Sequence, residues 1–366
     1  MKKNREKQKG AGFCNRDFVI AAVFVLFIVS MPVVTLVQNL AGGGEKEPSM
    51  ELKDRDGQDQ GWFLELRDGI EDFADGLFLR NDLISLNVEL TAFLSRNTYI
   101  QSTQVLLGKE GWLFYNTAAG VRPLWDYMGT HHYPEESLEA AAGNLVSARD
   151  YFEKEKGIRF VAVTCPNKSS VYPEYMPDTV LRVSEESRAD RMAAYLKEHT
   201  DVTYLYLKDE LLMAKNQAEL YYHTDTHWNL KGAFVGLQAV FREVYGTAAG
   251  LDSAIFHVGQ KGYKGDLATI ARLSDKYAAD IKYSFEAAGT DPAQYRDEVL
   301  LLVGDSFSDN LALIAQGYYR EVICIRIEDF RTEMVDRYHP DILIWENVER
   351  SLFRLIELDL SEMRDG

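Results

Sequence analysis

VLLLVGDSF, residues 299–307, joins a run of five apolar residues to a polar Gly-Asp-Ser turn. An apolar run of this length without alternation predicts a parallel strand that is buried on both faces. Ser306 then stands at the carboxyl end of that strand, where open α/β sheets place their functional groups. The alternative is a structural turn, in which Asp305 or Ser306 caps the first N–H groups of the next helix.

A second polar segment, DTHW at 225–228, offers an imidazole and a carboxylate two residues apart. Together with Ser306 they match the groups of a Ser-His-Asp acyl-transfer site, in which His227 takes the serine proton and Asp225 orients the imidazole. The alternative for Asp225 is a cap for the helix expected from about Trp228 to Val240. Both motifs in one chain favour the catalytic interpretation over either structural one.

Four further apolar runs have the character of central strands, and they lie at 158–165, 202–207, 322–325 and 341–345. Helix-sized intervals separate them, which predicts parallel βαβ units with helices on both faces of the sheet. The predicted fold class is therefore α/β, with a parallel sheet of about five strands. Residues 105–115 predict a β-hairpin, and residues 247–298 exceed a simple crossover, so we expect them to be an insertion over the sheet edge.

The N-terminal region predicts a membrane anchor. Residues 18–40 contain no charged side chain and, at about 1.5 Å per residue, they are long enough to cross the roughly 30 Å hydrocarbon core of a bilayer. A cleaved signal peptide is the alternative, although the apolar stretch exceeds the usual signal-peptide core. Basic residues predominate in 1–17, which predicts a cytoplasmic N-terminus. The predicted organisation is a cytoplasmic tail (1–17), a transmembrane anchor (18–40), a flexible stalk (41–61) and an extracytoplasmic domain (62–366).

Composition and net charge indicate a protein with a substantial core and without a nucleic-acid partner. The 366 residues are 46% hydrophobic, enough for a substantial core, and the net charge of −17 argues against a nucleic-acid partner. Three cysteines are too few for a disulfide framework, so Cys165 and Cys324 are expected to be buried free thiols, with pairing as the alternative. No spacing of Cys, His and carboxylates matches a zinc site, and we expect neither a metal nor a cofactor.

Seven short motifs in this order resemble a known family. They are GWLFY (111–115), PNK (166–168), VYPE (171–174), DTHWN (225–229), GDL (265–267), GDSF (304–307) and ERSL (349–352). The pattern covers roughly residues 75–355 and is similar to the SGNH-hydrolase superfamily, within it the AlgJ/AlgX-like (DHHW) family associated with O-acetylation of secreted polysaccharides. SGNH enzymes begin with the Ser strand and end with the Asp/His loop, whereas this order is reversed here. A circular permutation reconciles the two, because reading from Val299 and wrapping to the front restores the order and implies a flavodoxin-like sheet.

The resemblance also implies site residues. Asn347 follows the 341–345 strand, where the superfamily places an Asn that donates to the oxyanion, although its sequence context differs and a strand-end turn is the alternative. The backbone N–H of Ser306 is the other expected donor. Tyr222, Lys168 and Trp228 are candidate substrate-binding residues. The alternative for Tyr222 and Lys168 is that they cover the sheet edge, and Trp228 is expected mainly to pack beneath the His loop. Glu349 and Arg350 are expected to form a structural ion pair or a helix cap.

The implied function is an O-acetyltransferase that acts on an exported polysaccharide through an acetyl-serine on Ser306. A membrane-bound O-acyltransferase is the implied acetyl donor, and the catalytic domain is expected outside a cell membrane that the chain spans once. An acetylesterase with the same three residues is one alternative. A non-catalytic polymer-binding protein of an export complex is another, and it predicts that Ser306 and His227 lie too far apart for a hydrogen bond.

Overall fold

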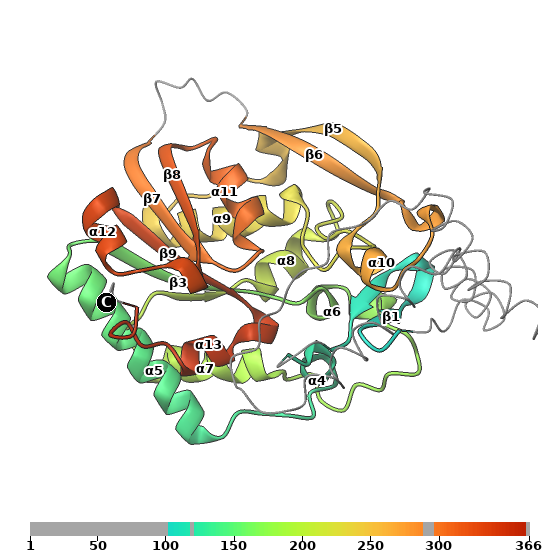
Figure 1. The fold of residues 1–366 in the computed structure, drawn as a ribbon, viewed down its shortest axis with the longest axis horizontal. Helices are drawn as coiled ribbons and strands as arrows, with labels where there is room; N and C mark the ends of the chain where they lie inside the picture. The colour runs from blue at the N-terminus through green and yellow to red at the C-terminus, as the bar shows by residue number, and fades with distance from the viewer. Residues whose placement is uncertain (1–101, 118–120, 288–295, 364–366) are drawn as a thin grey trace, which may run out of the picture. The chain divides into compact units, whose positions relative to one another are not determined.

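The computed structural model describes residues 102–117, 121–287 and 296–363, which belong to one compact unit, Val88–Gly366 (Figure 1). The predicted tail, anchor and stalk at 1–61, and the start of the predicted domain, lie outside the described residues. Within the described ranges, no helix is both long enough and apolar enough to cross a bilayer. The membrane anchor therefore remains a prediction.

The core of the fold is a five-stranded sheet in the order β4-β3-β9-β7-β8, with all neighbours parallel. Its strands are β3 (Arg159–Cys165), β4 (Tyr204–Tyr206), β7 (Arg296–Gly304), β8 (Tyr319–Arg326) and β9 (Ile342–Val348). Each of the five strands expected from the apolar runs is present, so the predicted α/β class with a parallel sheet is confirmed.

The strand order reflects the reversed motif order of the sequence. If β7 is taken as the first strand and the chain is followed through β8 and β9 and then back to β3 and β4, the spatial order becomes 2-1-3-4-5, which is the order of flavodoxin-like sheets. The first and third strands in this reading, β7 and β9, are neighbours. The order reverses between them, and the turn that carries Ser306 leaves the sheet at this point, where such sheets bind their ligands.

Helices cover both faces of the sheet (Figure 1). Alternation along β7 explains the two layers, since Leu300 and Leu302 belong to one buried cluster while Leu301 and Val303 belong to the other. The first cluster is completed by α8 (Lys208–Ala214), α9 (Leu230–Tyr245) and α11 (Ser308–Ala315). The second is completed by α5 (Glu135–Arg149), α7 (Arg188–His199), α12 (Glu333–Tyr338) and α13 (Phe353–Ile356).

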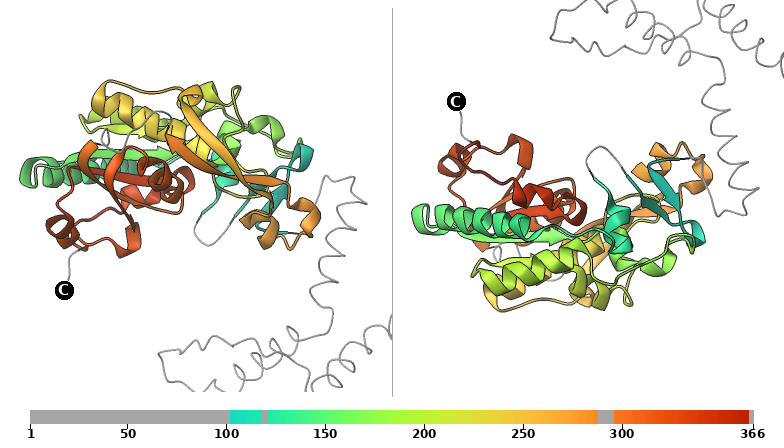
Figure 2. Two further views of the ribbon diagram at one scale, coloured as in Figure 1. Left: turned by 90° about the horizontal axis from the view of Figure 1, so that it is seen from above. Right: turned by 90° about the horizontal axis from the view of Figure 1, so that it is seen from below.

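The remaining elements surround one end of the sheet. Strands β1 (Val105–Leu107) and β2 (Leu113–Tyr115) pair antiparallel, as the predicted hairpin requires. Strands β5 (Ala254–Tyr263) and β6 (Asp280–Ala287) form a long ribbon that extends toward α10 (Asp266–Ile270) (Figures 1 and 2). Two short helices, α4 (Pro123–Met128) and α6 (Lys168–Val171), are the remaining α-helices of the described residues.

The two cysteines within the described ranges are free, as the sequence led us to expect. Cys165 is buried in the interior strand β3, but Cys324 is exposed. The expectation that Cys324 is buried was wrong, because β8 is the edge strand of the sheet and its burial is only partial.

Candidate active site

Ser306 lies in the turn between β7 and α11, with an exposed side chain. The preceding Asp305 holds this turn, since its Oδ1 accepts a hydrogen bond from the Phe307 backbone N–H (2.9 Å) and its Oδ2 accepts one from that of Val348 (2.8 Å). A side chain at position 304 is excluded, because a Cβ there would lie only 2.8 Å from Cβ of Ser308 as well as 2.5 Å from Oε2 of Glu346. These contacts hold Ser306 at the carboxyl ends of the neighbouring strands β7 and β9.

Asp225 and His227 lie in the loop before α9. Helix α9 begins at Leu230, and the side chain of Asn229 caps it by accepting from the backbone N–H groups of Lys231 (2.9 Å) and Gly232 (3.3 Å). Asp225 therefore does not cap this helix, and the structural alternative for it was wrong.

The loop brings His227 against Ser306. Nε2 of His227 lies 2.6 Å from Oγ of Ser306, and Nδ1 lies 2.6 Å from Oδ1 of Asp225. An ionised carboxylate only accepts, so Nδ1 carries the ring proton and the Nε2 lone pair faces the serine hydroxyl. The three residues form a continuous hydrogen-bonded chain, and this arrangement can remove a proton from the serine.

Two further hydrogen bonds tie the serine turn to the histidine loop. The indole Nε1–H of Trp228 donates to the backbone oxygen of Phe307 (3.1 Å), and the Asn310 amide donates to the backbone oxygen of Trp228 (2.8 Å). Trp228 is fully buried and packs against the ring of Phe307. It lies beneath the His loop, as expected, and its burial leaves no surface for substrate.

Asp225 is held from its other side by the end of β5 and the start of α10. Its Oδ2 accepts from the Tyr263 hydroxyl (2.7 Å) and from the Asp266 backbone N–H (3.1 Å). Burial by itself would raise the pKa of Asp225, but the hydrogen bonds that it accepts from His227 and Tyr263 outweigh burial and hold that pKa well below its usual value. The carboxylate is therefore ionised throughout the neutral range.

Lys168 is a positioning residue in this structure. Its ammonium group is buried and donates to the backbone oxygens of Tyr222 (3.0 Å), His223 (3.0 Å) and Asp225 (2.7 Å). Burial lowers its pKa to about 8. This position does not support the prediction that Lys168 contacts substrate. Its ammonium group donates all three of its hydrogen bonds to the loop that carries Asp225.

Asn347 also lies elsewhere than the sequence suggested. Strand β9 continues to Val348, so Asn347 is inside the strand, fully buried, and accepts from the hydroxyl of Thr164 on β3 (3.4 Å). It is not among the residues that line the cavity at Ser306. The side-chain amide that does line this cavity belongs to Asn310, one helical turn after the serine.

A cavity of about 260 Å³ opens beside Ser306 and His227. Tyr222 lines it, as expected for a candidate substrate-binding residue. The other lining residues are Asp225, Leu230, Tyr263, Lys282, Tyr283, Asp309, Asn310 and Leu313. Of these, Asn310 and Leu313 follow Ser306 at helical spacing and were accessible to sequence reasoning, whereas Lys282 and Tyr283 arrive on a distant ribbon that no motif marks.

Glu349 connects the end of β9 to α6, the helix that carries Lys168. Its Oε2 accepts from the Asn167 backbone N–H (2.7 Å) and from the Ser170 hydroxyl (2.7 Å), so the contacts of this residue are structural, whereas the expected ion pair with Arg350 is not among those of the described residues. The side chain is fully buried. Desolvation, together with the nearby carboxylate of Asp126, raises its pKa to about 7.

Substituting Glu349→Gln is expected to change the pH dependence of stability. Because the carboxyl pKa is about 7 in the folded state and about 4.5 when exposed, the folded state binds more protons between these values, and stability falls as the pH rises through that window. Glutamine still accepts from Asn167 and Ser170 but never ionises. At pH 8 the variant should gain up to about 3 kcal/mol of unfolding free energy relative to wild type.

The measurement is urea unfolding of both proteins at pH 5 and pH 8. Glu139→Gln, at an exposed position on α5, is the matched control and should leave the pH dependence unchanged. A Glu349→Gln protein that loses as much stability as wild type between pH 5 and pH 8 would contradict the buried-carboxyl explanation.

Asp225, His227 and Asp266 place three potential metal ligands within 4.8 Å of one another. The carboxylate oxygens are already engaged, since both oxygens of Asp266 accept from Thr226 (2.7 and 2.6 Å) and both oxygens of Asp225 accept from the groups described above. A metal ion would have to displace these donors, so we assign no metal to this cluster.

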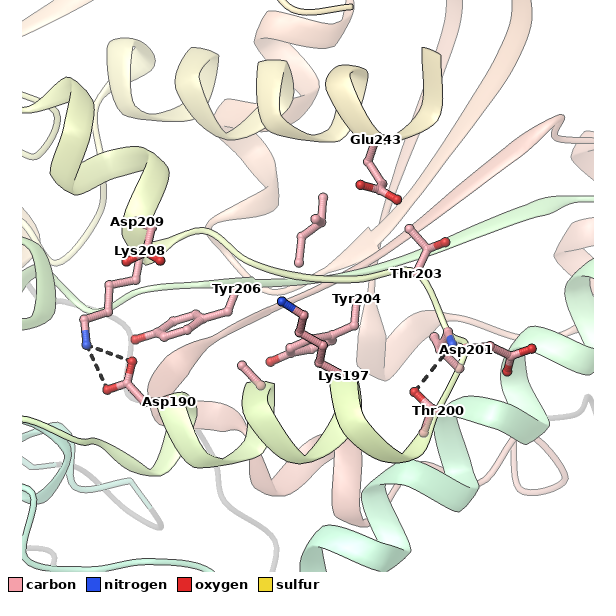
Figure 3. Close-up of a pocket in the computed structure, with 13 residues that line it drawn as sticks. Asp190, Lys197, Thr200, Asp201, Thr203, Tyr204, Tyr206, Lys208, Asp209 and Glu243 are labelled. Atoms are coloured by element: carbon pink, nitrogen blue, oxygen red, sulfur yellow. Dashed lines mark hydrogen bonds and ion pairs between the residues drawn. The ribbon is translucent and has the colours of Figure 1, made fainter. Parts of the chain in front are cut away.

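A separate cavity of about 590 Å³ lies beside the edge strand β4, between α7 and α9 (Figure 3). Its lining includes none of the candidate residues. Lys208 and Asp190 in its wall form an ion pair at 2.8 Å. Nothing in its lining forms a nucleophile or an acid–base pair comparable to Ser306 and His227.

Comparison with known proteins gives a family. Residues 105–320 match the family described as SGNH hydrolase-like domain, acetyltransferase AlgX. A probable alginate O-acetylase AlgJ of Pseudomonas syringae pv. tomato is 26% identical over 285 residues, which cover 68% of this chain and 69% of that protein.

Solved structures are also similar. The O-acetyltransferase domain of Pseudomonas putida AlgJ has a TM-score of 0.49 at 22% identity and covers 70% of this chain and 94% of that one. Bacillus cereus PatB1 with a sulfonyl adduct has a TM-score of 0.49 at 11% identity and covers 71% of this chain and 100% of that one. Since the family model matches more than half of the sequence, the chain belongs to the AlgX family of SGNH hydrolase-like domains and is an acetyltransferase.

Proposed function

We propose that this protein is an O-acetyltransferase that modifies an exported polysaccharide through a covalent acetyl-serine. The single observation that carries the proposal is the continuous hydrogen-bonded chain from Ser306 through His227 to Asp225, at 2.6 Å for each step. The similarity to a probable alginate O-acetylase supports a polysaccharide as the acceptor. Ser306 is the nucleophile, His227 the general base and acid, and Asp225 the residue that orients the imidazole.

The reaction has two halves. In the first, Oγ of Ser306 bonds to the acetyl carbonyl carbon while its proton passes to Nε2 of His227, which then returns that proton to the departing donor group. In the second, His227 takes the proton of a sugar hydroxyl, whose oxygen attacks the acetyl-serine, and Ser306 regains its proton as it leaves. Proton transfer of this kind typically contributes about 10²–10⁴-fold to the rate.

The tetrahedral intermediates need donors for their negative oxygen. The backbone N–H of Ser306 lies at the entrance to α11 and forms no hydrogen bond with the described residues. Asn310 supplies a second donor, since its amide lines the cavity and has one N–H beyond that given to Trp228. Each such donor is typically worth roughly 10²–10³-fold in kcat.

The same proposal includes the cellular location of the protein and the source of its acetyl group. Residues 18–40 anchor the chain in the cell membrane, and the domain that carries Ser306 faces outward. A membrane-bound O-acyltransferase delivers the acetyl group. Hydrolysis of the acetyl-serine would make the protein an acetylesterase, while a non-catalytic role is disfavoured by the hydrogen-bond distance between Ser306 and His227.

The test measures where the acetyl group goes. The full chain in mild detergent is given a chromogenic acetyl ester, with and without alginate oligosaccharides, and free acetate and acetylated sugar are quantified by mass spectrometry. Transfer to sugar hydroxyls is the expected result. Release of acetate alone, at a rate independent of the sugar, would identify an esterase, and absence of both products would overturn the acyl-transfer proposal for this substrate class.

A further inference from the structure

Backbone pairing between β7 and β9 ends before it reaches the nucleophile. The last paired residues of these two strands within the described chain are Val303 and Trp345, and Ser306 follows further along, in the turn to α11. The order of the sheet reverses at this point, and the turn leaves the sheet here. Other contacts must therefore hold the Ser306 turn against β9.

Two carboxyl groups connect this turn to β9 beyond the last backbone pair. Oε2 of Glu346 accepts from the backbone N–H of Asp305 (3.1 Å), and Oδ2 of Asp305 accepts from that of Val348 (2.8 Å). The two bonds run in opposite directions, so the turn and the strand each donate one and accept one. The carboxyl of Glu346 also lies against Gly304, where a Cβ would be 2.5 Å from Oε2. Glu346 therefore holds the backbone directly before Ser306.

Glu346 is an unusual residue for the interior of a sheet. It is fully buried on β9, and its Oε1 has no hydrogen-bond partner among the described residues. Burial, reinforced by the charge of Asp305, raises the pKa of Glu346 well above its usual value, although Cys165 and Arg350 act in the opposite direction. The group is therefore an uncharged acid at neutral pH. An apolar side chain would fill the same space without an unpaired polar atom, so stability alone does not account for this residue.

We propose that Glu346 is a positioning residue for the nucleophile, which holds the backbone of Asp305 and so sets the direction of Oγ and of the backbone N–H of Ser306. The inference rests on the proposed function, in which both of these groups act, and extends it to a residue that does not line the cavity at Ser306. A small displacement of the turn would lengthen the 2.6 Å contact between Ser306 and His227 and turn the N–H away from the oxyanion.

The test follows the reactivity of Ser306 without an acetyl donor or a sugar. Phenylmethanesulfonyl fluoride is added to the full chain in mild detergent, and the rate of sulfonylation of Ser306 is measured by intact mass, beside kcat for a chromogenic acetyl ester. Glu346→Met, of similar length, removes the acceptor and should slow both reactions about tenfold with KM unchanged, the loss expected for one net hydrogen bond. Glu346→Gln keeps an acceptor and resembles the uncharged acid, so both rates should stay within about twofold of wild type.

Ile344→Met is the matched control, because Ile344 is fully buried on the same face of β9, and it should leave both rates unchanged. Thermal unfolding checks the fold. If Glu346→Met does not fold, Glu346→Asp takes its place with the same expected loss, since it draws the carboxyl back by one methylene.

Unchanged sulfonylation in the folded variant, or an equal loss in Glu346→Gln, would overturn the positioning role. If the sulfonylation rates differ as expected but wild type transfers no acetyl group, the positioning role stands and the proposed function is overturned.

Discussion

Replacing Ser306 by alanine is expected to lower kcat for acetate release from a chromogenic acetyl ester by roughly 10⁴-fold or more. The substitution removes the only oxygen that lies within hydrogen-bond reach of Nε2 of His227 in the described chain, at 2.6 Å. His227→Ala should have an effect of similar size. The two losses should not add in the double variant, because each single change already stops the same covalent step.

The control is Ser147→Ala, which removes the hydroxyl of an exposed serine on α5 and should leave kcat unchanged. Intact-mass measurement gives an independent readout, since wild type incubated with the ester should carry one acetyl group on the peptide containing Ser306. Full activity in Ser306→Ala, or an acetyl group on another residue in wild type, would show that the nucleophile lies elsewhere.

The sheet could be predicted because buried parallel strands leave a strong local signal. Uninterrupted apolar runs such as 299–303 mark strands that are covered on both faces. The reversed order of the serine and histidine motifs then predicted a circular permutation, and the observed order β4-β3-β9-β7-β8 agrees with it. Both inferences depend on patterns within a few consecutive residues and on their order along the chain.

The position of Asn347 could not be predicted in this way. The apolar run 341–345 suggested that the strand stops before this residue, but β9 pairs with β3 through Thr164↔Asn347 and Cys165↔Val348. Pairing with a neighbour therefore extends the strand past its apolar run, and the Asn347 amide oxygen accepts from Thr164 instead of lining the cavity. How far a strand continues along a partner that is distant in sequence is not visible within its apolar run.

Lys168 was misinterpreted for a related reason. A lysine is rarely fully buried unless its charge is satisfied, and the sequence does not show which groups satisfy the charge of Lys168. Three backbone oxygens of the 222–225 loop satisfy it in the fold. Likewise, the contact of Tyr263 with Asp225 depends on how the β5–β6 ribbon folds back over the loop, which the sequence of the ribbon does not reveal.

Asp225→Asn is expected to lower kcat by about 10⁴-fold with little change in fold. Both carboxylate oxygens of Asp225 accept hydrogen bonds, whereas an asparagine amide has only one oxygen that can accept. If its NH₂ group faced His227, it would confront the ring N–H at Nδ1 and the backbone N–H, both of which now donate to Oδ1 at 2.6 and 3.0 Å. That conflict favours the other imidazole tautomer, whose Nε2–H can no longer accept the serine proton. If the NH₂ group faced Tyr263 and α10 instead, it would meet the backbone N–H of Asp266.

Tyr263→Phe serves as the comparison variant. Asp225→Asn removes the carboxylate charge and changes the tautomer of His227, whereas Tyr263→Phe removes only one hydrogen bond. Phenylalanine removes only the 2.7 Å donation to Oδ2, while Asp266 still donates to the same oxygen. A net hydrogen bond of about 1–1.5 kcal/mol corresponds to a loss of no more than about tenfold in kcat. The measurement is kcat for both variants at one pH, with thermal unfolding to check the fold. If Asp225→Asn also lost less than tenfold, His227 would be oriented by other neighbours, among which Asp266 lies 3.7 Å from Nδ1, and the role proposed for Asp225 would be wrong.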